Sequence, residues 1–497
     1  MTTSAPATLL RGSLVVRDAD HAPEPAEVLI ADGVIREVGP RLGESHRGPV
    51  VELDGHALLP GFVNAHFHSH DVLAKGSFEA MPLELWSIIA RGIGRARSTE
   101  EVRLRTLLAA IECLRNGFTT VQDFVNVTPG DEPMLDAMLD AYASAGIRVV
   151  LALSLRDRSE LAGIPWGREL IPASLQPLLG GPAAGARAGL AFVEQQLDRG
   201  GRRPLVSWAL GASAPHRCSP QLLRGIAALA DARGLPVYTH LYETQLQRLF
   251  ARQALTDHGG SALRYLADAG LIGPGVSVAH AIWVDADELA LLASSRTGVI
   301  LNPLSNLRLG SGIPPVAAYR RAGARLALGS DNASCSDLPS PFQAMKLLCL
   351  LGAADPVGGA PAATDALRAA TVGGAETAGL ATTIGRIEPG MAADLVAVDL
   401  RDPAYRPLND LRHQLVYAET GRGVRHVWVA GRQVVADGRS TLVDEGRLAA
   451  EVARLMPAVR DEVERLRTEA ERVRPALDRI RARARELDGD PDRYPPA

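Results

Sequence analysis

Eight short apolar runs, each followed by a stretch able to form a helix, constrain the fold of this chain more than any other feature. They lie between residues 59 and 384, and nearly every run stays apolar until its carboxyl end, which supplies a polar side chain. Strands that alternate with helices indicate a parallel sheet, so eight such runs predict an α/β fold, the (β/α)8 or TIM barrel. In a barrel these ends meet at one face. The runs are FVNAHFH, FTTVQDF, IRVVLALSL, PLVSWALGA, PVYTHLYE, VSVAHAIW, GVILNPLSN and ARLALGSDN.

Strand-like sequence also flanks the barrel region on both sides. Residues 1–58 hold short β-branched runs separated by turn signals, with Asp32-Gly33 as a hairpin turn, and they predict a small antiparallel sheet. Similar sequence returns in residues 385–445. We therefore expect one discontinuous β-sandwich domain, whose two parts come from the two sides of the barrel region. A barrel domain over residues 59–384 separates these two parts in the sequence.

Residues 446–497 are rich in Arg and Glu, and their apolar positions are spaced as on one face of a helix. This pattern predicts a C-terminal helical extension, packed on its own barrel or, as an alternative, against another subunit. Pro457 and Pro475 argue against one unbroken helix. The expected buried stripe consists of Val463, Leu466, Ala470, Val473, Leu477, Ile480, Ala484 and Leu487.

Residues 157–200, between the third and fourth runs, are rich in Gly, Pro, Ala and Arg. Because this segment follows a strand end on the face that carries chemistry, it is interpreted as a lid or substrate loop. A plain surface insertion is the equal alternative.

Composition excludes several classes of protein. The net charge is −4, from 53 basic and 57 acidic residues, so no basic field attracts nucleic acid. No apolar run is long enough to span a membrane, and no signal peptide is indicated. The four cysteines show no paired spacing, which favours reduced thiols and a cytoplasmic protein.

Five side chains that can bind a metal stand at the ends of barrel runs. His66 and His68 are two residues apart, so both face the barrel interior, and His240, His280 and Asp331 end three other runs. A lone buried His is usually structural, but five such residues at converging ends predict a metal site. Imidazoles with one carboxylate suit Zn²⁺ or, as an alternative, Fe²⁺, with an open position for water.

Glu243 lies three residues after His240, where it can face the metal-bound water without being a ligand. A carboxylate there can accept a proton and pass it to a leaving group or ring nitrogen; the alternative is a surface Glu at the start of a helix. Asp331 can also take a proton, and His280 can either bind the metal or donate a hydrogen bond. No barrel run contains a lysine that could bridge two metals, so a mononuclear site is expected.

Several motifs in order resemble the amidohydrolase superfamily, in particular its mononuclear deaminase and chlorohydrolase branch, which includes the S-adenosylhomocysteine/5-methylthioadenosine deaminases and the s-triazine hydrolases. They are LLPGFVNAHFH, THLYET, VAHAIW, NPLSNLRLGSGIPPV, LALGSDNAS and GRIEPGMAADLVAVDL, and the resemblance as a whole runs from about residue 25 to 445. The resemblance implies the barrel with its β-sandwich. It also implies metal ligation by His66, His68, His240 and Asp331, proton transfer by Glu243 and hydroxide orientation by His280.

The residues expected to touch the substrate depart from this family in part. Ser213 stands where the adenosine-type deaminases have a base-contacting His, and Cys335 follows the eighth strand near a substrate-facing position. Leu153 replaces an Arg that holds homocysteine, although Arg156 and Arg158 are nearby.

Other candidate substrate contacts lie after the first barrel run. Glu79 matches an acidic residue that holds ribose hydroxyls in the nucleoside deaminases, and Trp86 follows it as a further candidate contact. His70 and Asp71 come directly after the metal-binding pair, where they could touch substrate, support the ligands or lie in a surface loop.

Together these features predict a metal-dependent hydrolase, most simply an aminohydrolase that attacks an sp2 carbon of a nitrogen heterocycle or amidine through a metal-bound hydroxide. Hydrolysis of a cyclic amide, an N-substituted amine or a carbon–halogen bond is the alternative within enzymes, and a non-catalytic scaffold is the alternative outside them. The expected partner is a small-molecule substrate, with neither nucleic acid nor membrane. A homo-oligomer, dimer or tetramer, is also expected.

Overall fold

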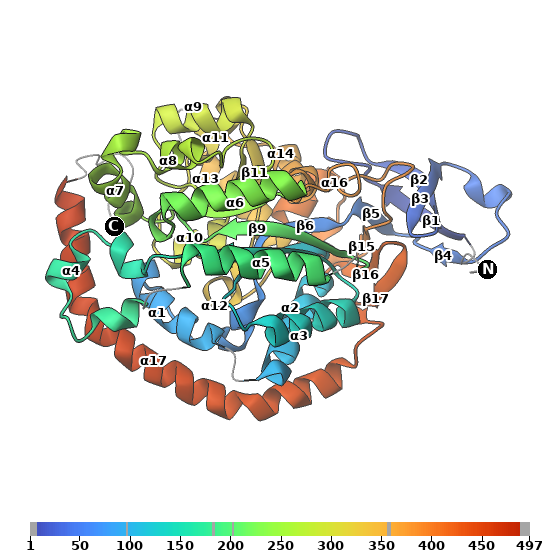
Figure 1. Cartoon of the computed structure of the whole chain (residues 1–497). Helices are drawn as coiled ribbons and strands as arrows, with labels where there is room; N and C mark the ends of the chain where they lie inside the picture. The colour runs from blue at the N-terminus through green and yellow to red at the C-terminus, as the bar shows by residue number, and fades with distance from the viewer. Residues whose placement is uncertain (1–6, 96–97, 181–183, 201–202, 355–358, 488–497) are drawn as a thin grey trace.

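The computed structural model describes residues 7–95, 98–180, 184–200, 203–354 and 359–487. Its central feature is a parallel barrel sheet in the order β13-β12-β11-β10-β9-β8-β7-β6-β14 (Figure 1). All eight predicted runs form these strands, and the eighth run is divided between β13 and β14. The strands are β6 (Phe62–His68), β7 (Phe118–Asn126), β8 (Arg148–Leu155), β9 (Val206–Ala212), β10 (Val237–Leu241), β11 (Val276–His280), β12 (Gly298–Leu301), β13 (Arg325–Leu328) and β14 (Asp331–Asn332).

The eighth strand closes the barrel. β13 pairs with β12, and β14, which follows it after two residues, pairs in parallel with β6. Asn64 fastens this closure, because its side chain accepts a hydrogen bond from the Ser330 backbone N–H at 2.9 Å and donates one to the Ser330 hydroxyl at 2.7 Å. The predicted (β/α)8 barrel is therefore confirmed.

Helices connect and cover the barrel strands (Figure 1). Those on the first half of the barrel are α1 (Leu83–Gly94), α2 (Thr99–Arg115), α3 (Glu132–Ala145), α4 (Gly167–Leu170), α5 (Ala186–Gly200) and α6 (Pro220–Arg233). Those on the second half are α7 (Gln245–Ala254), α8 (Ala262–Asp268), α9 (Ala286–Ser295), α10 (Pro303–Arg308), α11 (Val316–Arg321), α12 (Ala333–Ser336), α13 (Pro341–Ala353), α14 (Ala363–Arg368) and α15 (Gly374–Thr377). Among the described residues, no helix combines the length and apolar character that a bilayer span needs.

The two ends of the chain share a second sheet, in the order β18-β17-β16-β15-β5-β1-β2-β3, with β4 beside β1. β5 of the N-terminal part pairs antiparallel with β15 of the C-terminal part, as expected for a discontinuous unit. The prediction of a purely antiparallel sheet is wrong, because β1 pairs in parallel with β4 and β5. The domain limits at 58, 384 and 445 stay a prediction. The strands are β1 (Thr8–Val15), β2 (Glu24–Ala31), β3 (Val34–Gly39), β4 (Val50–Glu52), β5 (His56–Pro60), β15 (Leu395–Asp399), β16 (Val424–Val429), β17 (Arg432–Ala436) and β18 (Arg439–Ser440).

The segment between the third and fourth runs is folded rather than extended. It forms the 3-10 turns η3 (Glu160–Gly163) and η4 (Gln176–Leu179) together with α4, and it ends in α5. α5 packs on β8 and α6, so it is the ordinary helix that joins two barrel strands. Only the part before α5 is an insertion, and whether it acts as a lid stays a prediction.

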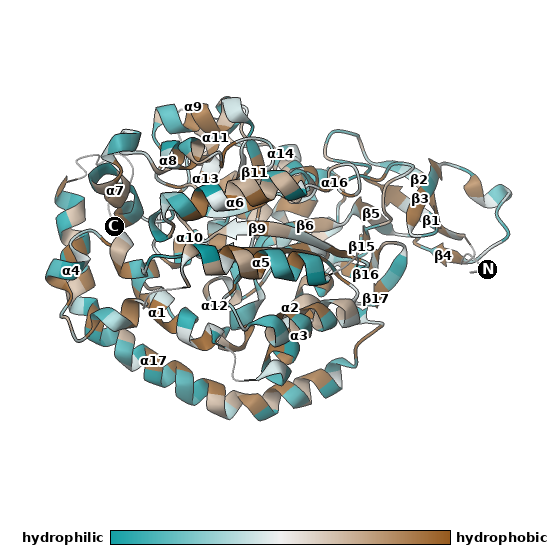
Figure 2. Cartoon of the chain, in the orientation of Figure 1, coloured by the Kyte–Doolittle hydropathy of each residue, from teal (hydrophilic) through white to brown (hydrophobic). Residues whose placement is uncertain are grey.

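The C-terminal extension is one curved helix, α17 (Glu445–Leu487), which wraps around the barrel (Figure 1). Hydrophilic and hydrophobic residues alternate along it (Figure 2), and its apolar stripe is buried against α1, α2, α4 and α7. Packing on its own barrel is therefore confirmed. Leu487 is an exception to the predicted stripe, because it is 59% exposed.

The prediction that the two prolines divide this helix is wrong, since Pro457 and Pro475 both lie inside it. An internal proline removes one backbone hydrogen bond and costs about 3 kcal/mol. Burial of a large aliphatic side chain contributes roughly 1.5–3 kcal/mol, and Val473, Leu477 and Ile480 are fully buried beside or near Pro475. The buried stripe therefore offsets the local cost of the prolines.

If α17 is part of the folded unit, Leu477→Ala should lower the free energy of unfolding by about 2–5 kcal/mol, because Leu477 is completely buried. Urea unfolding would measure the change. Asp478→Ala is the matched control at an exposed neighbouring position, where little change is expected. Equal stability of the two variants would contradict this packing.

Candidate metal centre and active site

Four histidines from three strands meet at the carboxyl end of the barrel. His66 and His68 end β6, His240 lies near the end of β10, and His280 ends β11. The ring centroid of His66 lies 4.8 Å from those of His68 and His240 and 5.5 Å from that of His280. The convergence of these strand ends, expected from the sequence, thus brings the imidazoles into one cluster.

Asp331 completes the cluster from β14. One carboxylate oxygen lies 3.5 Å from Nε2 of both His66 and His68, and the other lies 3.9 Å from Nε2 of His280. Two sets of three side chains can place one ligand atom each within 4.8 Å of one another. They are His66, His68 and His240, and His66, His280 and Asp331. The structure therefore brings together every residue that the sequence predicted as a ligand.

Hydrogen bonds to the other ring nitrogen orient three of these imidazoles. Nδ1 of His68 donates to the carbonyl of Phe124 at 2.8 Å, and Nδ1 of His240 donates to that of Ser213 at 2.7 Å. Nδ1 of His280 donates to Oδ1 of Asn306 at 2.8 Å. Since each proton is on Nδ1, the Nε2 lone pair is left for the cluster, as in metal-binding histidines.

The polar atoms at the centre of this cluster fit a metal ion. Nε2 of His66 and Nε2 of His280 are buried and have no hydrogen-bond partner within the described part of the chain. Buried nitrogen atoms without a partner are costly unless something else satisfies them. Neutral imidazoles with a carboxylate form a donor set that suits one divalent ion.

The surroundings favour the protonation states that a metal site needs. Burial lowers the pKa of His66 to about 4, and burial together with the neighbouring imidazoles lowers that of His240 well below its ordinary value. Burial alone would raise the pKa of Asp331, but the nearby imidazoles of His66, His280 and His68 hold it well below its usual range. Burial thus favours the neutral imidazole at His66 and His240, and the neighbouring imidazoles favour the ionised carboxylate at Asp331, which are the states in which such groups bind a metal.

Glu243 lies beside the cluster but outside both sets of potential ligands. It follows the end of β10, its carboxylate lies 3.8 Å from Nε2 of His280, and only 6% of the residue is exposed. The side chain of Gln247 accepts a hydrogen bond from its backbone N–H at 2.9 Å. Burial, followed by the charge of Asp331, raises the pKa of Glu243 well above its ordinary value. A buried carboxyl at this distance can transfer a proton to or from a group held at the cluster.

Two residues of the cluster adopt an unusual backbone conformation. His280 and Asp331 have φ angles of 71° and 62°, in the left-handed region that favours glycine. Such conformations cost of order 1 kcal/mol or more and are concentrated at functional sites. His280 is the last residue of β11 and Asp331 is the first residue of β14. The direction of each side chain therefore depends on the turn of the backbone as well as on the strand.

A small cavity of about 80 Å³ is lined by four of the five cluster residues, all except His66, and by Glu243. Three predicted substrate-binding residues, His70, Trp86 and Ser213, line it. The indole N–H of Trp86 donates to the hydroxyl of Ser334 at 2.9 Å, which fixes the ring against the segment that follows β14. These three residues are therefore placed where a substrate could reach them.

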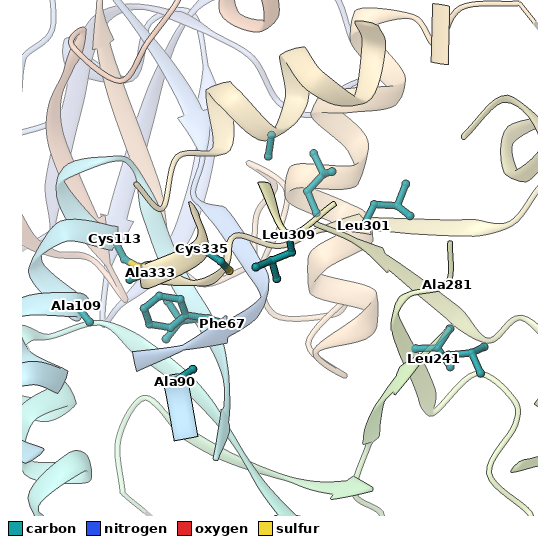
Figure 3. Packing of buried hydrophobic residues seen from close by; sticks show 14 of the residues in the cluster. Phe67, Ala90, Ala109, Cys113, Leu241, Ala281, Leu301, Leu309, Ala333 and Cys335 are labelled. Atoms are coloured by element: carbon teal, nitrogen blue, oxygen red, sulfur yellow. The ribbon is translucent and has the colours of Figure 1, made fainter. Parts of the chain in front are cut away.

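The other two predicted substrate contacts do not line this cavity. Glu79 is exposed, between the 3-10 turn η2 (Ser69–Ala74) and α1. Cys335 is buried near Phe67 and Leu309 (Figure 3), and burial and the charge of Asp331 raise the pKa of its thiol well above the ordinary value. Cys335 lies 3.9 Å from Asp331, so it adjoins a cluster residue and not the cavity.

Asp71 supports the site from behind. Its carboxylate accepts hydrogen bonds from the backbone N–H groups of Ala333 and Ser334 at 3.1 and 3.3 Å and from the Ser334 hydroxyl at 2.5 Å. These bonds tie the residues after β6 to those after β14. Asp71 does not line the cavity, and of the alternatives that the sequence leaves open these contacts favour the supporting one, which stays a prediction.

Several residues of the site are not evident from the sequence. Asn306 of α10 orients His280, and Arg91 and Arg217 line the cavity from α1 and the 3-10 turn η5 (Pro215–Arg217). Asn306 belongs to the NPLSNLRLGSGIPPV motif, so this motif could have identified it as a residue of the site. Arg91 lies in a helix and Arg217 in a 3-10 turn. No alternation of apolar and polar residues in the sequence indicates that these two side chains face the cavity.

The family model that matches this chain is that of the amidohydrolase family, over residues 57–434. The chain belongs to the amidohydrolase family. Among similar proteins, a 5-methylthioadenosine/S-adenosylhomocysteine deaminase of Syntrophobacter fumaroxidans is 32% identical over 86% of this chain and 92% of its own length. A 5′-deoxyadenosine deaminase of Methanopyrus kandleri is 31% identical over 76% of this chain and 81% of its own length.

Solved structures of similar fold include an adenosine deaminase from Xanthomonas campestris with bound zinc. It has a TM-score of 0.79 and 27% identity, covering 91% of this chain and 98% of that one. An atrazine chlorohydrolase from Arthrobacter aurescens, complexed with zinc, has a TM-score of 0.79 and 24% identity over 90% of this chain and all of that one. This second likeness is one of fold alone. The predictions of a TIM-barrel amidohydrolase and of hydrolysis at a carbon–nitrogen bond are confirmed.

If the cluster binds one divalent ion, the purified protein should contain about one equivalent of metal, and His240→Ala should reduce the content well below that value. The reason is that the variant removes one of the ligand nitrogens directed at the centre. Elemental analysis after dialysis would measure it. His413→Ala, at an exposed histidine of α16 (Leu411–Tyr417), is the control and should keep the metal. A metal content in His240→Ala equal to that of the control would contradict this assignment.

Proposed function

We propose that this amidohydrolase is an aminohydrolase that releases ammonia from an sp2 carbon of a nitrogen heterocycle or amidine. The observation that carries the proposal is the buried carboxylate of Glu243, 3.8 Å from His280 and beside a cluster of potential metal ligands. The relatives named as deaminases of adenosine derivatives support the same reaction class. In this proposal His66, His68, His240 and Asp331 hold one metal ion, which is Zn²⁺, with Fe²⁺ as the alternative.

The bound metal ion would supply a Lewis acid that makes water more acidic at neutral pH. Glu243 accepts a proton from the attacking water and transfers it to the ring nitrogen next to the reacting carbon. The new carbon–oxygen bond forms as the ring nitrogen gains this proton. The carbon–nitrogen bond to the amino group then breaks, and with the second proton of the water the amine leaves as ammonia.

His280 holds the water in position in this proposal. Its ring is fixed by Asn306 at Nδ1, and its Nε2 is directed at the cluster, between Glu243 and Asp331. A fixed imidazole on one side and a carboxylate on the other define the direction from which oxygen approaches the carbon. Such preorganisation requires no reorganisation during the reaction. His70, Trp86 and Ser213 bind the substrate from the cavity wall, and Glu79 and Cys335 stay predicted contacts that this cavity does not include.

Glu243→Gln should leave the metal content intact and reduce ammonia release by about 10²-fold to 10⁴-fold, because the amide cannot accept the proton. Ammonia release from a panel of aminated heterocycles, including adenosine and 5-methylthioadenosine, would measure it. Glu388→Gln, at a partly exposed carboxylate outside the cavity wall, is the control. Full activity of Glu243→Gln would contradict the role of this residue, and release of chloride or of an acid without ammonia would favour hydrolysis of a different bond.

A further inference from the structure

A buried carboxylate on α1 lies close to the active site but takes no part in the proposed chemistry. Glu84 is the second residue of α1, only 6% of it is exposed, and it does not line the cavity at the cluster. Among the described residues, its side chain has one hydrogen bond to another residue, which the hydroxyl of Thr244 donates to Oε1 at 3.0 Å, and no ion pair. Because a carboxylate is costly to remove from water, this position requires an explanation.

The partner of Glu84 is the residue that directly follows Glu243. Thr244 precedes the first residue of α7, where a threonine usually accepts a hydrogen bond from a backbone N–H of the first helical turn. Its side chain makes no such bond and donates to Glu84 instead. The two residues are 160 positions apart, so this bond links the first helix of the barrel to the segment after β10.

The backbone on the other side of Glu243 is strained. Tyr242 has a φ angle of 46°, in the left-handed region that is unfavourable for a residue with a side chain. Such a conformation persists only where the surroundings hold it in place. Gln247 accepts the hydrogen bond of the Glu243 N–H, and the bond between Thr244 and Glu84 holds the next residue. The direction of the Glu243 side chain thus depends on contacts made by its neighbours.

The charges around Glu84 also place it near Glu243. Burial raises the pKa of Glu84, while the charge of Arg481 on α17 and the hydrogen bond from Thr244 act in the opposite direction. After burial and the charge of Asp331, the charge of Glu84 contributes to the raised pKa of Glu243. The two carboxyl groups are therefore near neighbours inside the protein, although Glu84 is separated from the cavity.

Packing alone does not account for a carboxylate at this position. The adjoining residues Leu83 and Leu85 are buried and apolar, so an apolar side chain at position 84 would be buried without the cost of removing a charge from water. An ionised carboxylate accepts a stronger hydrogen bond than a neutral group does. What Glu84 provides, and an apolar residue would not, is a firm attachment for Thr244.

We propose that Glu84 is a positioning residue for Glu243. By accepting the hydrogen bond of Thr244, it holds the strained turn in the conformation that directs the carboxylate of Glu243 toward Nε2 of His280. This proposal rests on the proposed function, because it assigns to Glu84 the support of the residue that transfers the proton. Glu84 itself touches neither the substrate nor the cluster.

Two substitutions of Glu84 test whether its acceptor oxygen matters. Glu84→Met removes the acceptor from a side chain of similar length, so it should lower kcat for ammonia release by about tenfold to a hundredfold, because misplacement of a reacting group is costly. KM should stay within about threefold, and the metal content should not change. Glu84→Gln keeps an acceptor oxygen and should retain kcat within about threefold. Each kcat is taken at the pH of its maximum, so that a change in protonation is not counted.

An unchanged kcat in Glu84→Met would overturn the proposal, and so would equal losses in the two variants.

Substitutions of Thr244 test whether Glu84 acts through this residue. Thr244→Val has the same shape without the hydroxyl and should lose kcat as Glu84→Met does, whereas Thr244→Ser should retain it. The double variant Glu84→Met/Thr244→Val should be no slower than the slower single variant, because both changes remove the same bond. Losses that multiply in the double variant would show that the two residues act separately, contrary to the proposal.

A control variant distinguishes positioning from a general loss of stability. Glu419 is another buried carboxylate, outside the cavity wall, and accepts a hydrogen bond from the hydroxyl of Tyr405 at 2.7 Å. Glu419→Gln should lower the Tm because it weakens a buried hydrogen bond to a charged group, but it should keep kcat per bound metal ion. If it lowered kcat as much as Glu84→Met does, the loss would reflect stability and the proposal would fail.

Crystal structures of the wild-type protein and Glu84→Met in one crystal form separate this proposal from the proposed function. The carboxylate of Glu243 should move away from Nε2 of His280 in the variant, beyond the 3.8 Å of the native arrangement. If no compound releases ammonia but Glu243 is displaced, the proposed function fails and the positioning role stands. If ammonia is released but Glu243 keeps its place in the variant, the positioning role fails alone.

Discussion

The pairing of β14 with β6 is the contact on which the candidate site depends. It places Asp331 opposite Phe67 and Asn332 opposite His68, so the last strand joins the first at the level of the histidine pair. The link between β13 and β14 must pass very close to β6. A Cβ atom on Gly329 would lie 2.4 Å from the amide oxygen of Asn302 and 2.7 Å from Cβ of His66. A glycine is therefore required where the barrel closes, because any larger residue would push Asp331 away from the imidazoles.

The placement of protons in the cluster follows from the barrel as well. Carbonyl groups of neighbouring strand ends, those of Phe124 and Ser213, accept the Nδ1 protons of His68 and His240. A carbonyl can only accept, so each ring is fixed in one tautomer without using a charged group. Burial disfavours a second proton on His240, and it also makes the unpartnered Nε2 atoms of His66 and His280 costly unless a bound group satisfies them. Backbone geometry and desolvation thus act in the same direction.

The sequence predicted the barrel and the cluster because both follow from regular patterns. The apolar runs define the strands, the period of two places His66 and His68 on one face, and parallel strands bring His240, His280 and Asp331 to the same edge. Substrate contacts were harder to predict, since Glu79 and Cys335 lie in segments without a strand register, where neighbours decide whether a side chain faces solvent, core or cavity. Arg91 was missed for the same reason. α17 continues through two prolines because its apolar side chains are buried against the barrel. Helix propensity, which depends only on the local sequence, does not include this burial.

Residues of α17, on the outside of the barrel, can affect the position of the cavity wall that α1 forms. α17 packs on α1, and α1 supplies Trp86 and Arg91 to the wall of the cavity at the cluster. Gly92 of α1 leaves room for Leu466 of α17, since a Cβ atom on Gly92 would come within 2.4 Å of that side chain. A change in the bulk of α17 residues facing α1 would therefore displace a wall of the cavity while leaving the barrel strands in place. Selectivity among related compounds could be adjusted from the C-terminal helix, by evolution or by engineering, without altering any group that performs the hydrolysis.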